Sequence, residues 1–233
     1  MVASPTVYLI SGANRGIGLE LVTQLSARPG NVIFAGARDP SKADKLNARA
    51  QEKGNIEVVK LAAPDAEDAQ AVAKVIEQKA GKLDVLIANV GISDHWVPLV
   101  DHKVEWFREM FEVNTLGPLV LFQQSYPLLA KSAMPKFFVI SSELASTATA
   151  TSWPMTSYGT SKCAINHILN HAHHDYPDLL AVSICPGWVA TDIGNAGARL
   201  QGKESAPTTV EDSVTAILKL ADNVTRKTHG GKC

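Results

Sequence analysis

Short runs of apolar residues alternate with amphipathic stretches along the whole 233-residue chain. The runs are rich in β-branched residues, are bounded by turn or polar residues, and lie at 7–11, 32–35, 56–61, 85–88, 137–140 and 182–185. Continuous apolar runs of this length are typical of strands that are buried on both faces of a sheet. Each run is therefore predicted to be a strand of a parallel sheet.

Apolar residues at helical spacing fill the intervals between these runs. The clearest sets are Leu19, Val22 and Leu25; Val72, Val75 and Ile76; and Ile165, Ile168, Leu169 and Ala172. Regular alternation of strand and helix requires right-handed crossovers that place helices on both faces of the sheet. The prediction is an α/β fold with one domain over 1–233, a doubly wound Rossmann-type sheet with strand order 3-2-1-4-5-6. The long helical stretch at 102–131 contains Gly117-Pro118 and Pro127, which predict a kink or break.

Composition and charge exclude several classes of partner. The net charge is −1 with a pI near 6.7, and no block of like charge is present, so neither nucleic acid nor an anionic membrane is an expected partner. No signal peptide or membrane span is predicted. Cys163, Cys185 and Cys233 are scattered and odd in number, which favours free thiols in a reducing compartment. We expect a cytoplasmic protein whose partner is a small molecule.

A glycine-rich loop follows the first predicted strand. Gly12-x-x-x-Gly16-x-Gly18 leads directly into the amphipathic stretch at 19–25. Glycines let the backbone approach a pyrophosphate closely, and the N–H groups at the start of the next helix attract the anion. Such a loop is a weak signal alone, but its place at the start of a β-α series predicts a phosphate-binding site.

Tyr158 and Lys162 lie four residues apart on a predicted helix. By themselves they are ordinary neighbours on one helix face. Beside a dinucleotide site they indicate hydride transfer, because a carbonyl oxygen that gains charge needs a proton donor within hydrogen-bond reach. A nearby ammonium favours the phenolate, so Lys162 is expected to lower the pKa of Tyr158 from its usual value of about 10.

These two motifs together resemble the short-chain dehydrogenase/reductase family, and the resemblance covers nearly the whole chain. Further matches occur in the family's order at Asn89-Val90-Gly91, Asn114, Ser141-Ser142 and Pro186-Gly187-Trp188-Val189-Ala190-Thr191. With Asn14 and Arg15 in the loop and Asp192 after Thr191, the chain is most similar to carbonyl reductases of the fungal polyketide ketoreductase and bacterial C-factor type.

The resemblance implies a role for each matching residue. Tyr158 is the proton donor, Lys162 also bonds the nicotinamide ribose, Ser142 positions the substrate oxygen, and Asn114 holds a water that connects Lys162 to solvent. Two alternatives stay open: Ser141 could be the serine that points inward, and Asn114 could be a buried amide bonded to the backbone. The cofactor-binding residues implied are Gly12, Asn14, Arg15, Gly16, Ile17, Gly18, Arg38, Ala63, Asn89, Gly91, Tyr158, Lys162, Pro186, Gly187, Val189 and Thr191.

Arg38 indicates which nicotinamide cofactor is bound. It stands 20 residues after Gly18, where an acidic residue would bond the ribose 2′-hydroxyl of NAD and an arginine accommodates the 2′-phosphate of NADP. Arg15 adds a second cation, and NADP(H) is the prediction. In the alternative, Arg38 is a solvated turn residue that pairs with Asp39. The acidic residue that the family has after the third strand is replaced here by Leu61-Ala62-Ala63.

The expected substrate pocket is formed by large apolar residues that follow the carboxyl ends of strands. These residues are Trp96, Trp153, Met155 and Trp188, whereas Trp106 is expected in the core. Ser142 and Tyr158 are 16 residues apart, a few more than is usual in the family, so the segment 144–156 is interpreted as an extended pocket wall. The glycine-containing segment 193–208 lacks clear periodicity and is predicted to be a mobile lid.

The resemblance also implies a homodimer or homotetramer that pairs through helices at 105–122 and 165–169. The apolar residues that favour this interface are Phe107, Phe111, Leu119 and Phe122, although packing within the core could also account for them. The family adds a seventh strand after a helix near 214–221, whereas this chain stops at Gly230-Gly231-Lys232-Cys233, so either the sequence is truncated or that strand is absent. No metal is expected, and the histidines at 167, 171, 173 and 174 are interpreted as a solvated helix face.

The predicted function is the NADP(H)-dependent reduction of a ketone or aldehyde on an apolar, including aromatic, substrate, or oxidation of the corresponding alcohol. One alternative is a catalytically silent NADP-binding sensor or scaffold, and another is a dehydratase or epimerase on the same fold. The complete set of Asn114, Ser142, Tyr158 and Lys162 argues against a silent protein. The natural substrate depends on loop shapes that the sequence does not reveal.

Overall fold

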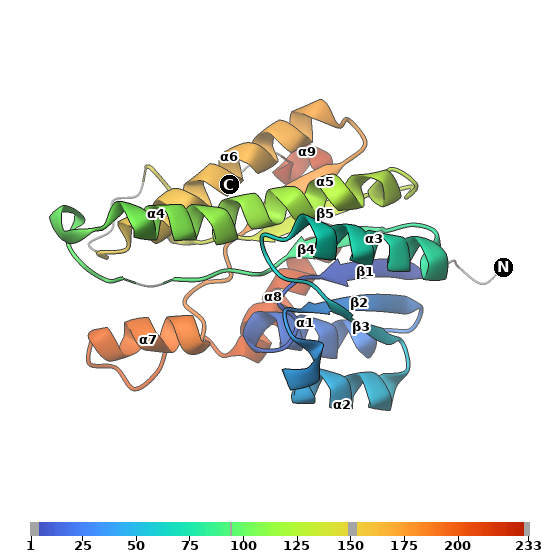
Figure 1. The fold of residues 1–233 in the computed structure, drawn as a ribbon, viewed down its shortest axis with the longest axis horizontal. Helices are drawn as coiled ribbons and strands as arrows, with labels where there is room; N and C mark the ends of the chain where they lie inside the picture. Colours follow the sequence, from blue (N-terminus) through green and yellow to red (C-terminus); the bar gives the residue numbers. More distant parts are fainter. Residues whose placement is uncertain (1–4, 94, 149–152, 231–233) are drawn as a thin grey trace.

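Strands and helices alternate along the chain in the computed structural model, which describes residues 5–93, 95–148 and 153–230 (Figure 1). Six parallel strands form one sheet in the order β3-β2-β1-β4-β5-β6, and the predicted single-domain Rossmann-type fold is confirmed. The strands are β1 (Thr6–Ile10), β2 (Asn31–Ala37), β3 (Ile56–Lys60), β4 (Val85–Ala88), β5 (Lys136–Ile140) and β6 (Leu180–Ile184). No strand end differs from its prediction by more than two residues.

Helices cover both faces of this sheet. They are α1 (Gly16–Ser26), α2 (Asp44–Lys53), α3 (Ala66–Ala80), α4 (Val104–Phe111), α5 (Gly117–Leu129), α6 (Thr156–Asp175), α7 (Asp192–Leu200), α8 (Val210–Asn223) and α9 (Arg226–His229). Short 3₁₀ turns are η1 (Pro40–Lys42), η2 (Leu99–Asp101) and η4 (Glu143–Ala145). Figure 1 shows α3, α5 and α6 on one side of the sheet and α1 and α2 on the other.

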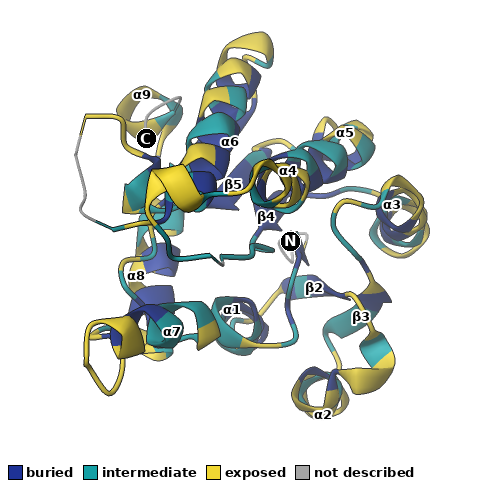
Figure 2. Cartoon of the chain, turned by 60° about the vertical axis from the view of Figure 1, so that its left-hand side comes forward, coloured by how far each residue is buried: buried dark blue, intermediate teal, exposed yellow. Residues whose placement is uncertain are grey.

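Alternate residues of each strand belong to two separate hydrophobic cores. In β5, Phe137 and Val139 pack with α3, α5 and α6, whereas Phe138 and Ile140 pack with α1 and α8. This two-residue period explains why the strand runs are apolar throughout, since both faces are covered. Figure 2 shows the buried residues of the helices facing the sheet and the exposed ones facing outward.

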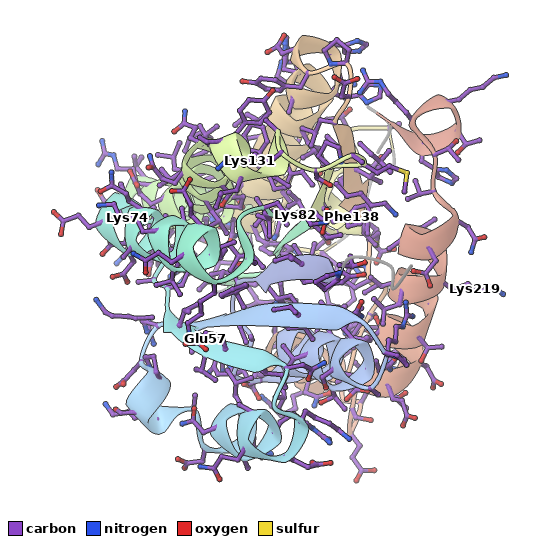
Figure 3. The ribbon with its side chains drawn as sticks, turned by 90° about the vertical axis from the view of Figure 1, so that its right-hand side faces the viewer. Glu57, Lys74, Lys82, Lys131, Phe138 and Lys219 are labelled. Carbon is purple, nitrogen blue, oxygen red and sulfur yellow. The ribbon has the colours of Figure 1, made fainter. Side chains whose placement is uncertain are left out.

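Charged side chains lie outside these cores. Figure 3 shows Phe138 inside the molecule and Lys74 of α3 extending from its surface. Within the described ranges, no helix combines the length and the apolar character needed to cross a membrane. Cys163 and Cys185 are free thiols, whereas Cys233 lies outside the described residues.

The long helical stretch is broken at the predicted place. Glu112–Leu116 forms a π-helical turn, η3, between α4 and α5. Pro118 has no N–H group and cannot donate to the carbonyl of Asn114, four residues earlier, so an unbroken α-helix would leave that carbonyl without its partner. Single π-helical turns are frequent at functional sites, and this one carries Asn114. Pro127 is accommodated inside α5.

The carboxyl-terminal part of the chain continues as α8, as the 214–221 periodicity predicts, and then as α9. Arg226 of α9 donates hydrogen bonds to the backbone oxygens of His173, Tyr176 and Leu179, which join α6 to β6. In the part of the chain that the structure describes, the sheet ends at β6, and the seventh strand typical of the family does not occur.

Candidate active site

The glycine loop joins β1 to α1 in a conformation that needs its glycines. Gly12 and Gly16 have φ values of +64° and +52°, a region that other residues rarely adopt. A Cβ on Gly18 would lie 2.1 Å from the backbone oxygen of Gly12, so the first turn of α1 packs directly on the loop. Asn89 holds the loop from β4, because its Nδ2 donates to the oxygens of Ser11 at 3.0 Å and Gly12 at 3.1 Å.

The amino end of α1 is suited to an anion. Within the described residues, no side chain caps the helix at Arg15, and no acidic residue lies in its first turn. The first N–H groups of a helix have no partner inside the helix, and together with the helix dipole they attract phosphate. A dinucleotide pyrophosphate therefore fits this cradle. Asn14 and Ile17, both half-buried, flank the same turn.

Tyr158 and Ser142 meet at the carboxyl edge of the sheet. Tyr158 lies in the first turn of α6, and its hydroxyl is hydrogen-bonded to the Ser142 side chain. Gly159 makes this approach possible, because a Cβ there would lie 2.7 Å from the backbone oxygen of Leu144 in η4. Ser142 also accepts from the N–H of Leu144 at 3.2 Å, so the start of η4 holds the Ser142 hydroxyl in place.

Ser141 points away from this pair. Its hydroxyl donates to Oδ1 of Asn166 on α6 at 2.8 Å, and only 4% of the residue is exposed. The alternative in which Ser141 points into the site is therefore wrong, and Ser142 is the serine that faces Tyr158.

Lys162 and Asn114 form a buried group behind Tyr158. The Lys162 ammonium donates to the backbone oxygen of Ile140 at 2.8 Å. Gly91 lies against both side chains, since a Cβ on it would be 3.3 Å from Lys162 Nζ and 3.5 Å from Asn114 Oδ1. Asn114 bonds the backbone N–H and oxygen of Ile92 at 2.8 and 2.9 Å. Its side chain is thus a buried amide bonded to the backbone, as in the second interpretation of Asn114. Pro118, four residues later, cannot donate to the backbone carbonyl of Asn114.

Burial changes the pKa values of both candidate catalytic groups. Loss of hydration raises the pKa of Tyr158 to about 12, even though its hydrogen bond with Ser142 lowers the pKa. The expectation that Lys162 brings this pKa below 10 is therefore wrong for the protein by itself, because the Lys162 ammonium lies 5.9 Å from the ring centre and desolvation is the larger effect. Burial lowers the pKa of Lys162 to about 8, so it is still mostly protonated at neutral pH.

The two arginines predicted to bind a 2′-phosphate differ in their surroundings. Arg38 follows the end of β2 and is exposed, and among the described residues it has no ion pair. Asp39 instead pairs with Lys42 at 3.3 Å and accepts from the N–H of Ser41, so the proposed pairing of Arg38 with Asp39 is not formed. Arg15 bonds Asp192 at the start of α7.

The segment after β3 lacks the acidic residue that is usual in the family at this place, and other contacts hold it in position. The N–H of Ala62 donates to Asp68 at 3.0 Å, and Ala63 packs against Gly117, where an added Cβ would lie 3.0 Å from that of Ala63. A small hollow here is lined mainly by apolar residues, among them Leu61 and Val90. An adenine lying against this segment would be held by packing and backbone groups rather than by an acidic side chain.

Three of the predicted substrate residues form one aromatic cluster. The ring centres of Trp153 and Trp96 are 5.7 Å apart, and those of Trp153 and Trp188 are 5.1 Å apart. Gly197 of α7 lies against this cluster, because a Cβ on it would be 2.7 Å from Trp96 and 3.3 Å from Trp153. Met155 is buried at 5% exposure on the same segment as Trp153. Residues 149–152 of the extended wall lie outside the described residues.

Trp106 is not a core residue, contrary to the sequence-based expectation. It is half-buried and stacks on His95, with ring centres 3.8 Å apart. The edge of His102 contacts the same indole, and the ammonium of Lys103 lies 5.5 Å from the ring centre. Trp106 therefore packs against side chains of the loop before α4 and does not fill the space between the helix and the sheet.

The segment after β6 turns back toward the glycine loop. Gly187 has a φ of +81°, Pro186 accepts a hydrogen bond from Ser213 of α8, and Val189 pairs with Thr208 in a parallel bridge. Thr191 caps α7 by accepting from the N–H of Gly194 at 3.2 Å. Much of the segment predicted as an irregular lid is thus the helix α7.

The histidine group on α6 is partly as predicted. His167, His171 and His174 are exposed, and the rings of His167 and His171 lie 4.8 Å apart. His173 is buried at 8% exposure, and burial lowers its pKa. In the described ranges, no group of three or more histidine, cysteine or acidic residues is arranged to hold a metal ion.

Ser161 belongs to the site although the sequence analysis did not identify it. Its hydroxyl donates to the backbone oxygen of Tyr158 at 2.7 Å and receives a hydrogen bond from Asn114 Nδ2 at 3.0 Å. Thr115 donates to the backbone oxygen of Ser161 at 2.8 Å. The serine lies inside the Tyr158 to Lys162 interval, but a hydroxyl at this position is not a signal by itself.

A dinucleotide cradle and a Tyr-Lys pair at the same edge of a Rossmann sheet define an oxidoreductase. The chain matches the sequence model described as short chain dehydrogenase over residues 6–200, and it belongs to this family.

Curated relatives support the same placement. The chain is 35% identical to norsolorinic acid ketoreductase of Aspergillus parasiticus over 97% of its own length and 86% of the relative's. It is also 32% identical to an uncharacterized oxidoreductase of Schizosaccharomyces pombe over 99% and 95% of the two lengths. Among solved structures, NADPH-bound carbonyl reductase from chicken fatty liver superimposes with a TM-score of 0.88 at 29% identity, covering 98% of this chain and 95% of that one.

Proposed function

We propose that the protein is an NADP(H)-dependent carbonyl reductase that reduces a ketone or aldehyde on an apolar substrate. The observation that carries this proposal is the Ser142–Tyr158 hydrogen bond beside buried Lys162, at the edge of the sheet where the glycine loop also lies. Two hydroxyls that share a hydrogen bond can both reach one carbonyl oxygen, which is the geometry that protonation of a forming alkoxide needs.

The side chains would divide the work as follows. The cofactor supplies the hydride when it is bound. Tyr158, whose raised pKa keeps it protonated at neutral pH, donates its proton to the substrate oxygen, and Ser142 holds that oxygen in line. Lys162 stabilises the phenolate left behind and bonds the nicotinamide ribose. The backbone carbonyl of Asn114, to which Pro118 cannot donate, would accept a hydrogen bond from a water that returns the proton through Lys162.

Two kinds of evidence support NADP(H) over NAD(H). Arg38 follows β2 and makes no ion pair with any described residue, and an arginine binds a phosphate dianion well. The carbonyl reductase from chicken fatty liver, which is 29% identical to this chain, is NADPH bound in its solved structure. The residues proposed to contact the cofactor are those of the glycine loop, Arg38, Ala63, Asn89, Gly91, Tyr158, Lys162, Pro186, Gly187, Val189 and Thr191.

The loss of NADPH absorbance in the near-ultraviolet tests the reaction type directly. We expect it on addition of aromatic or polycyclic ketones. A silent sensor would bind NADPH, as seen by fluorescence, and oxidise none of it with any carbonyl. A dehydratase or epimerase would convert its substrate with no net change in NADPH.

Free Cys163 and exposed, free Cys185 support our proposal that the enzyme works in the reducing cytosol.

We expect the tryptophan cluster to select flat, apolar substrates. Burial of apolar area contributes about 25 cal/mol per Å², so a ring system packed on Trp153 gains more than a small aldehyde does. Trp153→Ala should raise KM for bulky aromatic ketones by about tenfold or more and change KM for small aldehydes much less. Trp106→Ala, outside the cluster, is the matched control. Equal effects on both substrate types would place Trp153 in a structural role.

We propose that the subunit pairs with a second copy through α4 and α6. Phe122, Ile165 and Leu169, which were predicted to contribute, are instead buried in the core at no more than 5% exposure. Exposed apolar side chains remain at Val104 (59%) and Phe111 (41%), which line a groove between α4 and α6. This groove supplies the unpaired apolar face that an interface needs.

The expected result is the mass of a dimer or tetramer by light scattering at micromolar concentration. Phe111→Glu should shift the mass to that of a monomer, because two buried carboxylates would then face the apolar groove. Met134→Glu, at a residue that is 73% exposed on another part of the surface, is the control and should leave the mass unchanged. A monomeric parent protein would rule out this interface.

A further inference from the structure

An ion pair joins the glycine loop to the start of α7, although its partners are 177 residues apart in the sequence. Arg15 precedes the first residue of α1, and its guanidinium bonds Asp192, the first residue of α7. Beside this pair, a Cβ on Gly16 would lie 3.4 Å from the Thr191 side chain. Figure 2 shows α7 next to α1. The amino ends of the two helices therefore meet where the anion cradle opens.

We propose that the Arg15–Asp192 ion pair is a clasp that holds α7 over the bound dinucleotide and slows its release. The inference rests on the proposed NADP(H) function, since it takes the amino end of α1 as the pyrophosphate site. An anion at the first N–H groups of α1 would lie beside the place where Thr191 approaches Gly16. The contact between α1 and α7 has to open for each exchange of cofactor.

Charge supports this assignment. A carboxylate beside a phosphate site repels the ligand unless a cation compensates it, and Arg15 is that cation. A carboxylate in the first turn of α7 also stabilises the helix through its dipole, which is the plain structural explanation of Asp192. If this were the only role of Asp192, no partner in the glycine loop would be required. Removing its charge would then lower thermal stability and leave the rate of cofactor release unchanged.

The exposure of the pair suits a contact that opens in every catalytic cycle. The two side chains are 72% and 76% exposed, and ion pairs of this kind are weak and sensitive to salt. From the same helix, Gly197 packs against Trp96 and Trp153. One clasp on α7 would therefore close the cofactor site and the tryptophan cluster together, so that both open together at the end of the cycle.

Stopped-flow release of NADPH and NADH tests the clasp. Asp192→Asn, which removes the charge with little change of shape, should release both cofactors about two- to fivefold faster. Arg15→Gln should do the same to NADH, which lacks the 2′-phosphate that Arg15 could also bond. Release from the parent protein should accelerate as NaCl is raised, while release from Asp192→Asn should respond much less.

The matched control is Asp222→Asn. It breaks the ion pair of Arg28 with Asp222, at 3.0 Å, which joins the carboxyl end of α1 to α8 and is also exposed. Release rates should not change in this variant. Thermal unfolding of all three variants separates a loss of helix stability from a loss of the clasp.

Two results would overturn the proposal. Unchanged release of NADH from both Asp192→Asn and Arg15→Gln would leave Asp192 with only its role in α7. Slower release of NADPH alone from Asp192→Asn would mean that Asp192 competes with the 2′-phosphate for Arg15 instead of closing the site. A parent protein that bound neither cofactor would contradict the proposed function itself, which this experiment detects before any variant is compared.

Discussion

Tyr158→Phe should lower kcat by about 10²- to 10⁴-fold and leave the dissociation constant of NADPH nearly unchanged. The substitution removes only the hydroxyl that is hydrogen-bonded to Ser142 and retains the ring that packs at the start of α6. The hydride donor and the cofactor site stay in place, so binding should persist while proton transfer fails. Steady-state rates combined with fluorescence titration of NADPH separate the two effects.

Two comparisons sharpen this test. Tyr126→Phe, in α5 and packed against Phe122 and Tyr176, is a matched control that should retain full activity. Lys162→Ala should lower turnover and cofactor binding together, because the ammonium is expected to contact both the phenolate and the ribose. If Tyr158→Phe kept most of its kcat at neutral pH, the donor would have to be Ser142 or a bound water.

The pH dependence of reduction follows from the direction of the two pKa shifts. Tyr158, with its pKa raised to about 12, carries its proton throughout the neutral range, so its own titration should not limit reduction below strongly alkaline pH. Lys162, with its pKa lowered to about 8, loses its proton as pH rises through that value. The rate of reduction in the alkaline range should therefore decline as the Lys162 ammonium is lost.

Local patterns in the sequence were sufficient to predict the framework of the site. The glycine loop could be recognised from its place after the first predicted strand. The Tyr158–Lys162 pair could be recognised from its four-residue spacing on a predicted helix. The strand order was that of a Rossmann-type sheet, which the regular alternation of strands and helices indicated. Even the orientation of Ser141 follows from strand alternation once β5 is located, because Val139 faces α6 and Ser141 two residues later faces the same way, toward Asn166.

Contacts between distant segments were not predictable. The pKa of Tyr158 depends mainly on how deeply its hydroxyl is buried. The sequence spacing between Tyr158 and Lys162 gives no information about that burial. The ion pair of Arg15 with Asp192 was not predicted, because the two residues are 177 apart in the sequence. The tryptophan cluster joins three separate segments of the chain. The helix α7 is short and contains glycines, so its helical pattern was not recognised in the sequence.

Arg38→Asp should reverse the cofactor preference. A charge-assisted hydrogen bond is worth about 1.5–3 kcal/mol, so loss of the bond to the 2′-phosphate should weaken NADPH binding by about ten- to a hundredfold or more. The new carboxylate would repel the phosphate of NADPH and could accept a hydrogen bond from the 2′-hydroxyl of NADH. Arg15→Gln should weaken NADPH less, because Arg15 already bonds Asp192.

Fluorescence titration of the parent and variant proteins with both cofactors measures this preference. Lys45→Asp introduces the same charge change at an exposed position of α2 and should leave the preference for NADPH intact. Equal affinities for NADPH and NADH in the parent protein would contradict the assignment of Arg38. Arg38 is exposed and makes no ion pair with any described residue, so its substitution should act on the phosphate rather than on the fold, and the variants should unfold at similar temperatures.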